Sequence, residues 1–180
     1  MINDIKFDEQ HEALKNIAKS KSTKLGVLIA TAFVISHLLI YLTGKSDSLS
    51  ANYIPLLILF LGVFLSNILF KKNMDNIAVF SELFGNGFKT ICLVCLFMIV
   101  WILISIQIFP DIKTIDIEIA KQSMISAGYT NVELQEGILV LENTNKYYLG
   151  KIQLVFKVYF AIGIIASLIS SLLFKTPKSS

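Results

Sequence analysis

The chain has 180 residues, of which 54% are hydrophobic, and its mean hydropathy is +0.68. This composition excludes an ordinary soluble domain and is typical of an integral membrane protein. The formal net charge is +3, and all sixteen basic residues are lysines. Because arginine is absent and the lysines are dispersed, the sequence argues against nucleic-acid recognition and against bidentate binding of phosphate or carboxylate groups.

Residues 1–24 are polar and charged and precede the first apolar run. We expect a cytoplasmic N-terminal segment that forms either an amphipathic helix on the membrane surface or a frayed tail. Leu14, Ile17 and Ala18 recur at helical spacing and would form the apolar side of that helix. The apolar run that follows is too long for the core of a cleavable signal peptide, so we expect it to be an uncleaved anchor.

The next two apolar segments, residues 25–44 and 52–70, are each long enough to cross a bilayer as a helix. The short polar loop between them, residues 45–51, predicts a helical hairpin. Each segment carries small residues four positions apart, a spacing that lets neighbouring helices approach closely. These residues are Gly26 and Ala30 in the first segment, and Gly62 and Ser66 in the second.

The third apolar run, residues 90–110, is uncharged from end to end and lies between Lys89 and Asp111. As a helix rising 1.5 Å per residue it covers about 31 Å, the hydrocarbon thickness of a bilayer. The preceding residues 71–89 are expected to form a cytoplasmic loop. Within that loop, Gly85-Asn86-Gly87 indicates either a break or a close contact between helices.

Residues 111–150 form the one sizeable segment outside the apolar runs. We expect this extracytoplasmic segment to begin with a helix that ends at Gly128. Residues 131–142 fit either two short strands around Glu136-Gly137 or a second helix broken at the glycine.

The fourth membrane helix is expected over residues 151–174, followed by a short cytoplasmic tail, 175–180. Gly163, Ser167 and Ser171 lie four residues apart and form a ridge of small side chains along one face. This ridge is the strongest helix-packing signal in the sequence. The fold class predicted from all segments is all-α: a bundle of four transmembrane helices with a small extracytoplasmic helical segment.

The distribution of lysines predicts the orientation of the bundle. Ten lysines lie in the N-terminal segment, the 71–89 loop and the tail, whereas six lie in the other two loops and at the start of the last helix. The excess of lysine marks the cytoplasmic side. Both termini are therefore predicted to be cytoplasmic.

Several short motifs follow one another along the chain. They are Tyr41-Leu42-Thr43-Gly44, Lys71-Lys72, Phe84-Gly85-Asn86-Gly87-Phe88-Lys89, Pro110-Asp111 and the run from Gly163 to Ser170. In their order and spacing these motifs resemble an uncharacterised family of bacterial membrane proteins, domain of unknown function 4199. The resemblance covers roughly residues 20–175 and implies a four-helix membrane protein of Gram-negative bacteria without an assigned activity, so the expected lipid bilayer is the inner membrane. The chain departs from the family in residues 131–142, where a more polar helical segment is expected.

Two groups of polar residues inside the spans are candidate sites. His37, with Ser105 and Gln107 at a similar depth and with Tyr53 and Tyr159 nearby, could pass a proton or bind a small ligand. The simpler interpretation, which we favour, is a neutral histidine with one hydrogen bond between helices. The second group is Asn67 with Ser66, opposite Ser167, Ser170 and Ser171, and here too we favour hydrogen bonding between helices over ligand contact.

The sequence carries no catalytic motif and no spacing of metal ligands. Cys92 and Cys95 could form a redox or metal pair, but two small apolar residues inside a helix explain them more simply. We therefore predict no enzyme, no cofactor and no metal. The expected function is that of a non-enzymatic accessory or scaffold subunit that packs against another membrane protein or against itself. The alternative is a small transporter or permeation protein that uses the polar cluster around His37.

Overall fold

The structure is a computed structural model that describes residues 2–44 and 49–176, with side chains for residues 10–44 and 53–176. The described part of the chain is helical and contains no strand, which confirms the all-α fold class. Parts of the predicted 45–51 loop and of the 175–180 tail, namely residues 45–48 and 177–180, lie outside the described residues.

The helices follow one another with short connections. The first three are α1 (Ile2–Leu42), α2 (Leu49–Asn73) and α3 (Phe80–Ile108). Two shorter helices follow, α4 (Asp111–Ser126) and α5 (Asn131–Glu142). The last long stretch combines α6 (Thr144–Leu154), a π-helical turn η1 (Val155–Phe160) and α7 (Ala161–Phe174).

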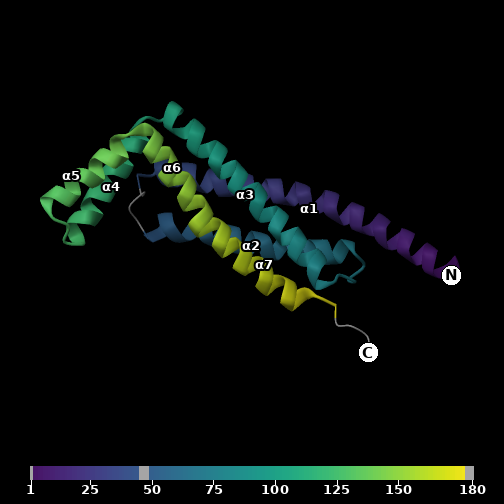
Figure 1. Ribbon diagram of the computed structural model, residues 1–180. Helices are drawn as coiled ribbons and strands as arrows, with labels where there is room; N and C mark the ends of the chain where they lie inside the picture. The colour runs from purple at the N-terminus through teal and green to yellow at the C-terminus, as the bar shows by residue number, and fades with distance from the viewer. Residues whose placement is uncertain (1, 45–48, 177–180) are drawn as a thin grey trace.

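Four of these stretches are long and apolar enough to cross a membrane: Gln10–Leu42, Tyr53–Asn73, Phe80–Ile108 and Thr144–Phe174. α1 and α7 each pack against both α2 and α3, and α2 also contacts α3. α1 begins and α7 ends at the same end of the bundle, whereas α4 and α5 form a hairpin at the opposite end and turn away from it (Figure 1). We call these the terminal end and the hairpin end.

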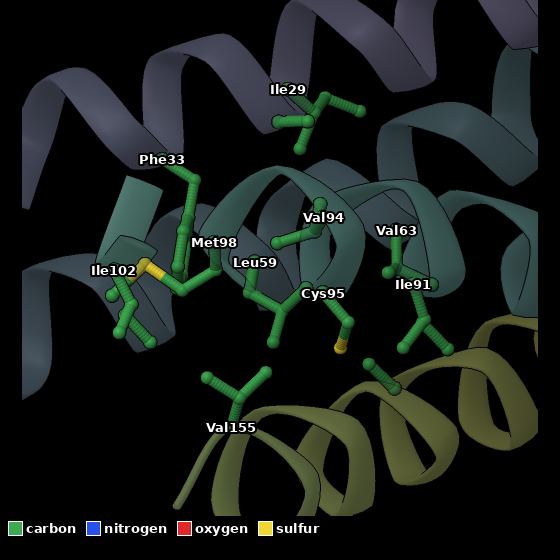
Figure 2. Close-up of a cluster of buried hydrophobic side chains, with 12 residues drawn as sticks. Ile29, Phe33, Leu59, Val63, Ile91, Val94, Cys95, Met98, Ile102 and Val155 are labelled. Atoms are coloured by element: carbon green, nitrogen blue, oxygen red, sulfur yellow. The ribbon is translucent and has the colours of Figure 1, made fainter. Parts of the chain in front are cut away.

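A cluster of buried apolar side chains fills the middle of the bundle and holds all four long stretches together (Figure 2). Phe33 of α1, Leu59 of α2, Val94 of α3 and Val155 of η1 are each at most 1% exposed. Because lipid is as apolar as this core, close packing rather than the hydrophobic effect stabilises these contacts.

Glycines mark the closest approaches between helices. A Cβ atom added to Gly26 would lie 2.9 Å from the Leu93 side chain, and one added to Gly163 would lie 2.7 Å from the Ile91 side chain. Gly62 faces Ile29 in the same way, and the other small residues predicted to pack helices are buried: Ala30, Ser66, Ser167 and Ser171. The ridge on α7 is therefore occupied by the chain's own α2 and α3.

The helices extend beyond the ranges expected from the sequence. The expected 1–24 segment is neither a separate interfacial helix nor a frayed tail, because from residue 2 onward it continues into the first span as α1. Ala18 is fully buried and Leu14 is half-buried against an inner cluster that includes Phe70 and Leu83, whereas Ile17 is 51% exposed. Leu14 and Ala18 of the expected apolar side therefore pack on the bundle itself.

The expected 71–89 loop is also shorter, because α3 already begins at Phe80. Gly85-Asn86-Gly87 lies inside that helix, and its second glycine is a close contact rather than a break. A Cβ atom added at Gly87 would collide with Ser167 of α7 and would lie 3.2 Å from Nδ2 of Asn67.

Residues 131–142 form one uninterrupted helix, α5, so neither expected alternative, two strands or a helix broken at the glycine, is correct. Thr130 begins it with a capping box, accepting from the N–H of Glu133 while the Glu133 carboxylate accepts from Thr130. These hydrogen bonds lower the pKa of Glu133. Gly137 does not break the helix. It lies where α5 contacts Met124 of α4, so the glycine allows close packing of the two helices.

The predicted end of the preceding helix agrees with the structure. α4 ends at Ser126, and Gly128 follows with φ +80°.

The two glycines at the start of α3 give a matched test of this packing. Gly87→Ala should lower the free energy of unfolding by about 1–3 kcal/mol, because the added methyl overpacks the contact with α7. Gly85→Ala should be neutral or stabilising by up to about 1 kcal/mol, since nothing lies within 4 Å of its Cβ position. Unfolding of the purified protein in mild detergent measures both, and equal stability of the two variants would contradict the close contact.

Candidate functional site

A pocket of about 300 Å³ opens at the hairpin end, between the end of α1, α3, α4 and α6. Most of its lining is apolar and includes Trp101, the single tryptophan of the chain. Polar groups enter it at two levels. His37, Ser105 and Tyr159 lie deeper in the spans, and Asp116, Tyr147 and Lys151 lie where the hairpin joins the bundle. We call the pocket the outer pocket.

The deeper level is built around an aromatic contact. The rings of His37 and Tyr159 both pack edge-on against Phe33, at centroid distances of 5.1 and 5.0 Å. Nε2 of His37 lies 3.4 Å from the Tyr159 hydroxyl, a long hydrogen bond whose direction depends on the histidine tautomer. Tyr159 belongs to the π-helical turn η1, which sets the register of this ring within the last span.

The upper level is an ion pair with a phenol. Nζ of Lys151 lies 2.7 Å from Oδ2 of Asp116, and the Tyr147 hydroxyl donates to the same carboxylate oxygen. Nζ of Lys151 and Nζ of Lys113 both lie within 6 Å of the Tyr147 ring centroid. These contacts join α4 to α6, so we call Asp116, Tyr147 and Lys151 the hairpin clasp.

The structure brings His37 and Ser105 into the outer pocket together with Tyr159, but it leaves Gln107 and Tyr53 exposed and outside its lining. Ser105 donates to the carbonyl of Ile102 in its own helix. The residues of the hairpin clasp were not singled out as a site from the sequence. The spacing of Tyr147 and Lys151, four apart on one helix face, was the signal available, but Asp116 joins them only through the fold.

A second group of polar residues lies at the opposite end of the bundle and is buried. We call it the inner network. The Asn86 amide is its centre: Nδ2 donates to Ser66 Oγ and to Asn67 Oδ1, both at 3.0 Å, while Oδ1 accepts from Ser22. Nδ2 of Asn67 in turn donates to Ser170 at 2.7 Å. The inner network therefore connects α1, α2, α3 and α7.

The remaining members close the inner network. Ser66 contacts Thr90 at 2.9 Å, and Ser171 donates to the carbonyl of Ser167 at 2.6 Å. No buried polar side-chain atom lacks a hydrogen-bond partner in the part of the chain that the structure describes. The grouping of Asn67 and Ser66 with Ser167, Ser170 and Ser171 therefore has the geometry of hydrogen bonding between helices. The sequence does not mark Asn86 as its centre, because the flanking Gly85 and Gly87 indicate a feature of the backbone rather than of the asparagine side chain.

The chemistry that these groups offer is limited. Cys92 is exposed on the side of α3, and Cys95 is buried in the apolar cluster, so the two thiols point into different surroundings. Among the residues that the structure describes, no three His, Cys, Asp or Glu side chains lie close enough to hold a metal ion. Comparisons of the chain with protein-family models, with curated proteins and with solved structures each found no match.

The inner network makes a direct prediction about stability. Asn86→Ala removes the partner of Ser22, Ser66 and Asn67 at once, and buried polar groups left unpaired cost about 1–3 kcal/mol. We expect the free energy of unfolding to fall by that amount. Asn145→Ala, at an exposed position of α6, should change it by less than about 0.5 kcal/mol. Unfolding in mild detergent again measures both, and a loss equal to that of the control would show that the inner network contributes nothing.

Proposed function

We propose that the protein is a non-enzymatic accessory or scaffold subunit of a membrane complex in the bacterial inner membrane. The observation that carries this proposal is the apolar surface of α5. Val132, Leu139 and Val140 are 66%, 64% and 45% exposed, although they lie outside the four apolar stretches that could cross a membrane. Exposed apolar groups of this size at a hairpin outside the spans favour contact with another protein.

The hairpin clasp supports the same proposal, because it fixes the direction in which α5 presents this surface. Lys113 of α4 makes a second connection: its Nζ donates to the carbonyl of Glu142 at the end of α5 and to the hydroxyl of Thr144 at the start of α6. The ridge of small residues on α7 gives no support to assembly, since the chain's own helices cover it. The partner surface proposed here is α5 instead.

The alternative, a transporter or permeation protein that uses His37, has less support. On α1 and α3 the outer pocket and the inner network are separated by apolar core residues: Phe33 lies between Ser22 and His37 on α1, and Val94 lies between Asn86 and Ser105 on α3. A polar solute passing from one polar group to the other would have to part this packed core. The proposed membership of domain of unknown function 4199 stays a prediction.

The proposed orientation places both termini in the cytoplasm, and two single cysteines test it. In a chain with Cys92 and Cys95 replaced by alanine, Ser126→Cys on the hairpin should react with a membrane-impermeant maleimide in intact spheroplasts. Ile77→Cys, exposed in the connection between α2 and α3, should react only after lysis. The reverse pattern would contradict the orientation.

The proposed partner surface is tested by affinity purification from native membranes. Leu139→Lys should remove a stoichiometric partner, because a lysine cannot be desolvated in an apolar interface without a large cost. Ile77→Lys places the same charge at an exposed apolar position at the other end of the bundle and should keep the partner. If Leu139→Lys retains the partner, or if the wild-type protein purifies without one, the scaffold proposal fails.

A further inference from the structure

We propose that the chain binds the phosphate headgroup of an anionic phospholipid in a pocket at the terminal end of the bundle. This pocket, which we call the basic pocket, lies between α1 and α3 and has a volume of about 550 Å³. Its lining includes Lys15 and Lys19 of α1 and Lys89 of α3, against a single carboxylate, Glu82. The lining residues alone carry a formal charge of +2, and Glu12, which pairs with Lys15 just outside the lining, reduces it to +1.

The contacts within the basic pocket determine which lysines are available to a ligand. Lys15 lies 3.3 Å from Glu82 and 3.3 Å from Glu12, so its charge is compensated within the protein. The Glu82 carboxylate also accepts from the N–H of Val79. Lys89 contacts only a neutral hydroxyl, that of Thr23, at 2.6 Å, and Lys19 has no ion pair or hydrogen bond among the side chains that the structure describes.

The floor and walls leave room for a headgroup. Gly85 lines the basic pocket and has nothing within 4 Å of its Cβ position, so the backbone of α3 is open to a ligand there. Asn86 also lines the basic pocket, but its amide N–H groups already donate to Ser66 and Asn67 and are not available to the phosphate. The two available ammonium groups therefore define the anion site.

The position of the basic pocket points to a lipid as the source of the phosphate. Lys89 directly precedes the uncharged run 90–110, so its ammonium lies at the boundary between the apolar span and water. Two turns further along each helix, on the same faces as the lysines, Val27 and Leu96 are 38% and 56% exposed. A phosphate held by Lys19 and Lys89 would place its acyl chains along these residues. Basic pockets between membrane helices on the cytoplasmic side are suited to anionic headgroups. The choice of the cytoplasmic leaflet rests on the proposed orientation, but the site does not depend on the scaffold function.

The test measures lipid binding to the purified full-length chain in detergent by native mass spectrometry. Phosphatidylglycerol should bind more tightly than phosphatidylcholine. The double variant Lys19→Gln with Lys89→Gln should weaken phosphatidylglycerol binding roughly thirty-fold, the loss expected for two lysine contacts. The matched control, Lys71→Gln with Lys72→Gln, removes the same charge from the same end of the bundle but outside the basic pocket and should change binding less than threefold.

The single variant Lys19→Gln separates a loss of binding from a folding defect. Lys19 is exposed and makes no contact that the fold needs, so the variant should fold normally and bind phosphatidylglycerol several-fold more weakly. Equal losses in the two double variants would show diffuse attraction to surface charge and overturn the site. Equal affinity for phosphatidylcholine would overturn the preference for an anionic headgroup. Displacement of the lipid by millimolar inorganic phosphate would identify a soluble anion as the ligand and overturn the lipid source.

Discussion

The structure depends on one constraint: a polar side chain inside the bundle must find its partner in the protein, because lipid offers none. The Asn86 amide meets this constraint by bonding to α1 and α2 at once, and Asn67 passes the connection on to α7. Each hydrogen bond between membrane helices contributes only about 0.6 kcal/mol on average. An unpaired buried amide costs more, about 1–3 kcal/mol or above. The inner network therefore acts mainly by making rotated or shifted packings of the same helices unfavourable.

Much of the fold could be predicted because apolar length and small-residue spacing are local properties of the sequence. The four spans and the packing of Gly26, Gly62 and Gly163 followed from them. The N-terminal segment and α5 could not be predicted in the same way. Whether Leu14 meets lipid or protein depends on where Phe70 and Leu83 lie, and whether Gly137 breaks a helix depends on Met124 across the hairpin. Both are tertiary contacts that no local pattern contains.

The same distinction between local sequence properties and tertiary contacts decides which parts of the candidate sites could be predicted. Asn67 and the serines of the last helix could be grouped by depth alone, because depth follows from position along a straight helix. The hairpin clasp could not, since it needs α4 to fold back over α6 before Asp116 reaches Tyr147 and Lys151. Gln107 shows the limit of depth as a guide: it lies near Ser105 in the sequence, yet its side chain is exposed and only Ser105 lines the outer pocket.

The two ends of the bundle consequently have different physical characters. At the terminal end every buried polar side chain that the structure describes has a hydrogen-bond partner, and exposed lysines surround these groups. At the hairpin end an ion pair holds a short helical hairpin whose second helix exposes apolar side chains. The small residues that membrane proteins often use between subunits are already used within this chain. The proposed contact with a second protein would therefore use a surface that the bundle leaves uncovered, and outside the spans α5 is such a surface.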